Sequence, residues 1–154
     1  MADNLGKKFE VKFKEDFSKI PGSSIDRIYD VTNGFYGLRN ICDYIGYIYP
    51  NIYYIECKSI LGNTFPLANL KQYDKLIKKI GIKGVIVGVV LWFRDHDKVI
   101  FVPIDTVTQI KNEGKKSIHV KMIGDPNYKI IDIPSIKKRT FLDSDYTVLL
   151  NMEV

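Results

Sequence analysis

The sequence predicts an α/β fold, in which helices flank a central mixed β-sheet. A helix-period segment opens the chain, and several strand-like segments alternate with shorter helical ones after it. The apolar run at residues 85–93 is continuous and rich in valine, which is typical of a strand buried on both faces. With 154 residues, of which 45% are hydrophobic, the chain can fill one core. We therefore expect a single domain over residues 1–154.

The first segment predicts an amphipathic helix of about four turns. Leu5, Phe9, Phe13 and Phe17 recur every fourth position, and lysines occupy the opposite side. Pro21-Gly22 follows and would end the helix.

Residues 24–32 then resemble a strand, before turn signals at Asn33-Gly34. Two segments rich in isoleucine and tyrosine come next, at residues 41–48 and 51–59. They meet at Tyr49-Pro50-Asn51 and predict a β-hairpin.

The remaining elements follow from apolar spacing and from proline and glycine. Pro66 could occupy a first helical position, and helical spacing continues to Gly81. After the buried strand and the polar turn R-D-H-D, we expect a strand at residues 98–104 and a short helix that ends before Gly114. Residues 117–123 predict another strand, and the C-terminal segment shows no clear pattern.

The bulk chemistry favours a soluble protein that binds a polyanion. The net charge of +5 and the pI of about 9.1 suit nucleic acid, although ribosomal and membrane-surface proteins reach similar values. Cys42 and Cys57 have no zinc-type spacing with each other or with the two histidines. We expect reduced thiols, no signal peptide, no membrane span and a cytoplasmic location.

The hairpin carries the polar residues of greatest interest, Asp43, Glu56 and Lys58. Side chains alternate between the faces of a strand. A turn centred on Tyr49-Pro50 would set Asp43 opposite Glu56, whereas a turn centred one residue later would set it opposite Lys58. Both registers place the three side chains on one face.

Two carboxylates at cross-strand distance repel each other unless a cation or a shared proton relieves them. A divalent metal ion between the carboxylates would remove this repulsion, and oxygen ligands favour magnesium or manganese over zinc. A metal and an ammonium group together could support phosphodiester cleavage. From spacing alone, an ordinary salt bridge on a solvated face is the more common explanation. The isoleucines and tyrosines around these charges argue against it.

Four short stretches occur in a fixed order: N-L-G-K-K-F-E at residues 4–10, C-D-Y at 42–44, E-C-K at 56–58 and F-P-L-A-N-L-K-Q at 65–72. In this order they resemble the RecU-type Holliday junction resolvases of the PD-(D/E)xK nuclease superfamily. The resemblance covers about residues 4–105, and it outweighs the salt-bridge interpretation.

The resemblance implies a restriction-endonuclease-like fold and a role for each matched residue. Asp43, Glu56 and Gln72 would hold Mg²⁺, with Mn²⁺ as an alternative, and Lys58 would stabilise the transition state. Glu10 would be a further acidic member of the catalytic site, although an exposed helix carboxylate explains it equally well.

Two departures from the family pattern concern the metal site and DNA recognition. Ile41 stands where the family often has a metal-site threonine, and residues 25–40 correspond to a shortened stalk that could instead contact a second subunit. The residues we expect to contact DNA are Arg27, Phe35, Tyr36, Arg39 and Lys71.

The sequence thus predicts a Mg²⁺-dependent, structure-selective endonuclease that resolves four-way DNA junctions. Because such junctions have twofold symmetry, paired incision would require a homodimer. Another PD-(D/E)xK nuclease acting on branched or duplex DNA is the alternative within enzymes. A junction-binding protein without catalysis is the alternative outside them.

Overall fold

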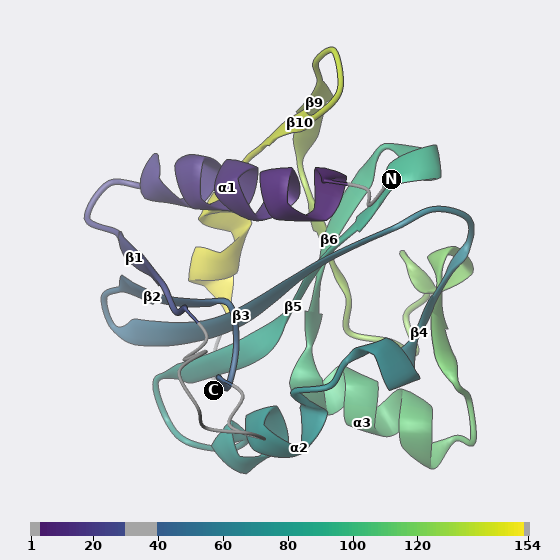
Figure 1. Ribbon diagram of the computed structural model, residues 1–154. Helices are drawn as coiled ribbons and strands as arrows, with labels where there is room; N and C mark the ends of the chain where they lie inside the picture. The colour runs from purple at the N-terminus through teal and green to yellow at the C-terminus, as the bar shows by residue number, and fades with distance from the viewer. Residues whose placement is uncertain (1–3, 30–39, 153–154) are drawn as a thin grey trace, which may run out of the picture.

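The computed structural model describes residues 4–29 and 40–152. A mixed six-stranded sheet has the order β1-β2-β3-β5-β6-β8 (Figure 1). In this sheet β3 and β5 are parallel, and every other neighbouring pair is antiparallel. The α/β class with a central mixed sheet is therefore confirmed. The strands are β1 (Ser24–Arg27), β2 (Tyr44–Ile48), β3 (Asn51–Ile60), β5 (Val85–Phe93), β6 (Lys98–Pro103) and β8 (Ile131–Ile133).

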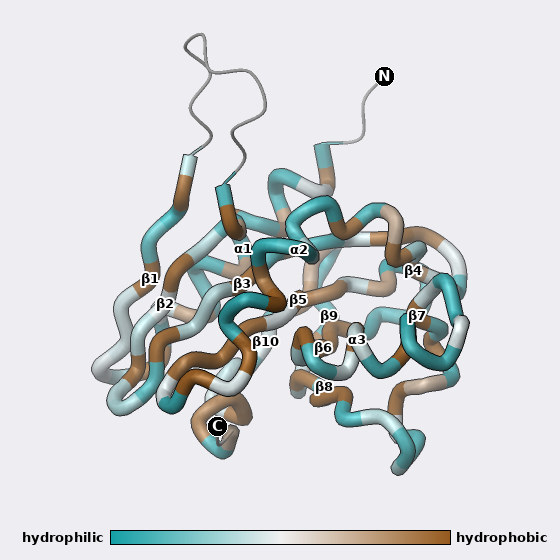
Figure 2. The backbone as a smooth tube through the Cα atoms, turned by 90° about the horizontal axis from the view of Figure 1, so that it is seen from below, coloured by the Kyte–Doolittle hydropathy of each residue, from teal (hydrophilic) through white to brown (hydrophobic). Residues whose placement is uncertain are grey.

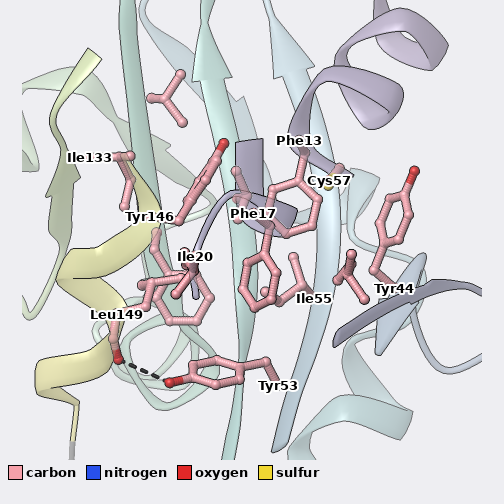
Figure 3. Close-up of a cluster of buried hydrophobic side chains, with 14 of the residues drawn as sticks. Phe13, Phe17, Ile20, Tyr44, Tyr53, Ile55, Cys57, Ile133, Tyr146 and Leu149 are labelled. Atoms are coloured by element: carbon pink, nitrogen blue, oxygen red, sulfur yellow. Dashed lines mark hydrogen bonds between the residues drawn. The ribbon is translucent and has the colours of Figure 1, made fainter. Parts of the chain in front are cut away.

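Helix α1 (Leu5–Ser18) covers one face of the sheet, as its phenylalanine spacing predicts. Phe9, Phe13 and Phe17 are buried there, together with residues of the C-terminal 3-10 helix η5 (Tyr146–Asn151). Figure 3 shows this cluster, in which the Tyr53 hydroxyl donates a hydrogen bond of 3.2 Å to the backbone oxygen of Leu149.

The other face of the sheet packs against shorter elements. These are α2 (Tyr73–Leu76), α3 (Ile104–Asn112) and a small sheet of β4 (Thr64–Pro66) and β7 (Ser117–His119). A further hairpin of β9 (Ser135–Lys137) and β10 (Leu142–Ser144) extends beyond α1 at the top of Figure 1. Two short 3-10 helices follow strands: η3 (Arg94–His96) joins β5 to β6, and η4 (Val120–Met122) comes directly after β7.

The β2–β3 hairpin adopts the first of the two predicted registers. Tyr44 pairs with Ile55 and Ile48 pairs with Asn51, so the register continues to Asp43 opposite Glu56. The strand expected at 41–48 begins only at Tyr44, because the chain bends at Asp43. The site residues therefore lie where β2 starts beside the middle of β3.

The prediction of one helix between Pro66 and Gly81 is wrong. The segment forms η1 (Leu67–Asn69), the single turn of α2 and η2 (Ile77–Lys79). Leu70 leaves the helical region, with φ −90° and ψ 81°. Its side chain is buried with those of Leu67 and Leu76 against the sheet. The apolar residues at helical spacing are therefore buried although the backbone of this segment does not form one continuous helix.

Three predicted boundaries also shift. Pro66, expected at a first helical position, is the last residue of β4. The strand expected at 117–123 ends at His119 and continues as the 3-10 helix η4. The strand expected at 24–32 ends at Arg27 within the described part of the chain. The expectations for Phe35, Tyr36 and Arg39 lie outside the described residues.

Across residues 4–29 and 40–152, every helix is too short or too polar to cross a bilayer.

Candidate functional site

Three elements and the bend before β2 bring five charged side chains together. Glu10 comes from α1, Arg27 from β1, Asp43 from the bend, and Glu56 and Lys58 from β3. Helix α1 packs across β3, and β1 lies beside β2 at the edge of the sheet (Figures 1 and 2). The sheet register and the helix packing thus assemble residues that are up to 48 positions apart in sequence, from Glu10 to Lys58.

The Asp43 carboxylate is held in place from two sides. Its Oδ2 accepts a hydrogen bond of 2.9 Å from the backbone N–H of Cys57, and its Oδ1 lies 2.8 Å from the Arg27 guanidinium. The backbone oxygen of Asp43 accepts a bond of 2.8 Å from the N–H of Ile28. The bend before β2 is therefore fixed to both neighbouring strands.

Glu56 is the buried member of the cluster, with 1% of its surface exposed. Its Oε1 lies 3.7 Å from the Lys58 ammonium, and its Oε2 is buried with no hydrogen-bond partner among the described residues. Burial, and then the neighbouring carboxyl group of Asp43, raise the pKa of Glu56 to about 9. The carboxyl group is thus protonated near neutral pH unless another cation replaces its proton.

Arg27 joins the two remaining carboxylates. Its guanidinium lies 2.8 Å from Asp43 and 3.2 Å from Glu10, and it also stands 5.3 Å from the centre of the Tyr44 ring. Burial raises the pKa of Glu10, and the nearby charge of Asp43 raises it further. Glu10 is therefore a half-buried member of the cluster. The ion pairs of Arg27 were missed from sequence, although its position opposite Tyr44 at the end of β1 could have indicated them.

Gln72 lies in the position before α2, so it is not inside the continuous helix expected between Pro66 and Gly81. Its Oε1 is buried and has no hydrogen-bond partner among the described residues. The contacts found within residues 4–29 and 40–152 do not join Gln72 to the other four predicted residues. The neighbouring Lys71 is exposed.

The donor chemistry at this site fits a hard divalent cation. Within the described part of the chain, Glu56 and Gln72 each present a buried oxygen atom without a hydrogen-bond partner, and Asp43 adds a carboxylate next to Glu56. Oxygen ligands of this kind suit Mg²⁺ or Mn²⁺. In the described parts of the chain, however, His, Cys, Asp and Glu side chains alone do not form a metal-holding group of three. Gln72, or a rearrangement of the Arg27 ion pairs, would be needed to complete one.

The fold and the site together define a class of protein. It is an α/β protein with a mixed sheet, in which the bend before one strand presents an aspartate and the adjoining strand presents a Glu-x-Lys pair. The family model for RecU, described as recombination protein U, matches residues 16–143. The chain therefore belongs to the RecU family, and the resemblance seen in its motifs is confirmed.

A search of solved structures gives a similar chain in Hjc, a Holliday junction resolvase from the archaeal hyperthermophile Archaeoglobus fulgidus. The two chains share 19% sequence identity, with a TM-score of 0.46. The match covers 66% of this chain and 78% of the Hjc chain. No curated protein matches the sequence.

Proposed function

We propose that this protein is a Mg²⁺-dependent, structure-selective endonuclease that resolves four-way DNA junctions and depends only weakly on DNA sequence. Membership of the RecU family supports a Holliday junction resolvase. The observation that carries the catalytic part is the state of the Glu56 carboxyl group beside Asp43. Its Oε2 is buried without a hydrogen-bond partner among the described residues, and its Oε1 lies 3.7 Å from the Lys58 ammonium. A buried carboxyl group with its pKa raised to about 9 is typical of a functional site.

We infer that Asp43, Glu56 and Gln72 hold the cation. When bound, Mg²⁺ would supply Lewis acidity toward a phosphodiester oxygen and lower the pKa of a nearby water. Its charge would also favour the ionised form of Glu56. The hydrogen bond from the Cys57 N–H fixes the direction of the Asp43 carboxylate, so one ligand is oriented in advance.

Lys58 has a separate role in this proposal. Its ammonium lies on the same strand face as Glu56, two residues further along β3, and is partly exposed. It can therefore approach a phosphate from the solvent side and stabilise the negative charge that develops during cleavage. Glu10 and Arg27 line the same cluster and set the charge around it.

We further propose that DNA recognition depends mainly on backbone contacts. Arg27 belongs to the charged cluster, Lys71 is exposed next to Gln72, and the net charge of +5 favours binding to phosphates. Affinity should then fall steeply with added salt. Because a four-way junction needs two incisions, we propose a homodimer with one site in each subunit, and light scattering of the purified protein would test it.

A cleavage assay on a synthetic four-way junction tests this function. We expect cutting in Mg²⁺, none in EDTA, and a loss of at least about 100-fold for Glu56→Gln. Glu15→Gln, which changes an exposed carboxylate on α1, is the matched control and should cut normally. Cutting that survives Glu56→Gln would contradict the site.

The same assay separates the two alternatives. Equal cutting of four-way, Y-shaped and linear duplex DNA would favour a less selective nuclease of the same superfamily. Tight junction binding without cutting in Mg²⁺ or Mn²⁺ would favour a non-catalytic junction-binding protein.

A further inference from the structure

A cleft of about 520 Å³ lies between α1 and β1, next to the charged cluster. Glu10 and Arg27 belong to both, so the cleft is continuous with the cluster. A volume of this size has room for a ligand as large as a nucleotide. The cluster accounts for one end of the cleft only, and the rest of the lining has no role in the function proposed above.

The charge of the cleft favours an anionic ligand. Lys7, Lys14 and Arg27 line it, against the single carboxylate of Glu10. Lys7 and Lys14 are both exposed, and they lie on the same side of α1 about 10 Å apart along its axis. Lysines at this spacing can contact successive phosphates of a strand that runs along the helix.

An aromatic side chain stands at the edge of the same cleft. Tyr29 leaves 77% of its surface exposed, so its ring is open to contact from solvent. The Arg27 guanidinium lies 5.8 Å from the centre of its ring. An exposed ring beside phosphate-binding cations is the combination by which proteins hold unpaired DNA, because any base can stack on the ring. A duplex backbone would need the lysines but not the ring.

We propose that this cleft holds one unpaired DNA strand as it enters the cluster, with phosphates on Lys7 and Lys14 and one unstacked base on Tyr29. The proposal rests on the function proposed above, and it names the part of a branched substrate that the cleft recognises. Tyr44 forms the floor, where its hydroxyl donates a hydrogen bond of 2.9 Å to the backbone oxygen of Glu10 and fixes α1 over the strand. The cleft would thus select DNA that can be opened next to the scissile phosphate.

Binding in EDTA tests the proposal without cleavage. Fluorescence anisotropy would compare the full chain, carrying Glu56→Gln, on a Y-shaped DNA with single-stranded arms and on a blunt duplex of the same paired sequence. Adding Tyr29→Ala should weaken binding to the Y-shaped DNA about tenfold and binding to the duplex less than twofold. Tyr29→Trp should retain the preference.

Each substitution in the cleft has a control outside it: Tyr49→Ala for the tyrosine and Lys8→Ala for the lysines. Tyr49, 81% exposed at the turn between β2 and β3, lies outside the cleft, and Tyr49→Ala should change neither affinity. Adding both Lys7→Ala and Lys14→Ala should reduce the slope of log affinity against log salt concentration by about 1.4 on a single strand, whereas Lys8→Ala should leave it unchanged. Lys8 is exposed on the same helix outside the cleft.

Equal losses on both DNAs with Tyr29→Ala, no loss on either, or the same loss with Tyr49→Ala would overturn the proposal. The cleavage assay with unmodified protein is run in parallel. An uncut junction there would count against the endonuclease function while leaving the binding comparison interpretable. Normal cutting combined with unchanged binding by Tyr29→Ala would reject the cleft alone.

Discussion

The Arg27 guanidinium lies 2.8 Å from the Asp43 carboxylate, in the cluster where we propose that a divalent cation binds. A second contact of 3.2 Å links Arg27 to Glu10. The arginine therefore neutralises carboxylates that would otherwise repel each other. A cation bound to Asp43 would be repelled by the same guanidinium.

Removal of the Arg27 charge should consequently strengthen metal binding. We expect Arg27→Gln to bind Mn²⁺ about tenfold more tightly than the unmodified protein, or about 1.4 kcal/mol, because a positive charge beside the site is lost. Isothermal titration without DNA would measure the change. Arg27→Lys keeps the charge and should behave like the unmodified protein. Weaker binding by Arg27→Gln would indicate that the arginine organises the ligands instead.

The pKa of Glu56 predicts how the metal-free protein responds to pH. The pKa is raised from 4.5 to about 9 on folding, so the folded protein holds a proton that the unfolded chain releases. This contribution to stability is fully present below about pH 4.5 and is lost as the pH rises toward 9. Urea unfolding in EDTA should therefore show a free energy of unfolding that decreases across this range.

Glu56→Gln should reduce this pH dependence, because the amide stays neutral throughout. We expect the variant to be more stable than the unmodified protein by at least about 1 kcal/mol at pH 8. Exposed Glu15→Gln provides the comparison for a carboxylate outside the cluster. Parallel pH profiles for Glu56→Gln and the unmodified protein would show that Glu56 is ionised in the metal-free protein.

The elements that could be predicted from sequence are those with a strong local pattern. Helix α1 follows its phenylalanine spacing, and β5 follows its unbroken apolar run. The alternation of side chains places Glu56 and Lys58 on one face of β3, and either of the two predicted hairpin registers adds Asp43 to that face. Local periodicity therefore identified most of the candidate site.

The remaining features depend on contacts between distant segments. The approach of Arg27 to Asp43 and Glu10 requires the bend before β2 and the packing of α1 at once. Leu70 is buried at a position that fits the helical spacing, yet its backbone is not helical, and the residues just before it in β4 and η1 are held by β7 and by the Lys116 backbone oxygen. Neither outcome is encoded in the spacing of neighbouring residues.

The β9–β10 hairpin is linked to α1 through the buried carboxylate of Asp16. Asp16 is 3% exposed, lies 2.8 Å from the Lys12 ammonium and accepts a hydrogen bond of 3.1 Å from the Ser144 N–H in β10. Lys12 also contacts Asp143 at 2.7 Å. Asp16→Ala should reduce the free energy of unfolding by about 3 kcal/mol, because it leaves a partly buried ammonium and a buried N–H without this partner.

Chemical denaturation would measure this loss, with Glu15→Ala on the exposed side of α1 as the comparison. Hydrogen exchange should show loss of protection in β9 and β10 for Asp16→Ala. A change below about 0.5 kcal/mol would mean that the apolar contacts of Leu142 hold the hairpin without the charge.

Two glycines should respond to alanine in opposite directions. A Cβ atom on Gly88, in the middle of β5, would lie 2.5 Å from both the Phe101 ring and the Val102 backbone oxygen. The backbone oxygen cannot move without disturbing the pairing of β5 with β6, so Gly88→Ala should destabilise the protein by about 2–3 kcal/mol.

Gly6 lies in α1, where the nearest atom to an added Cβ is the Ser59 Oγ at 3.9 Å. Gly6→Ala should therefore stabilise the protein by about 0.5–1 kcal/mol, through the higher helix propensity of alanine. Thermal unfolding of the two variants would measure both effects, and a destabilised Gly6→Ala would show that the start of α1 needs the freedom of glycine.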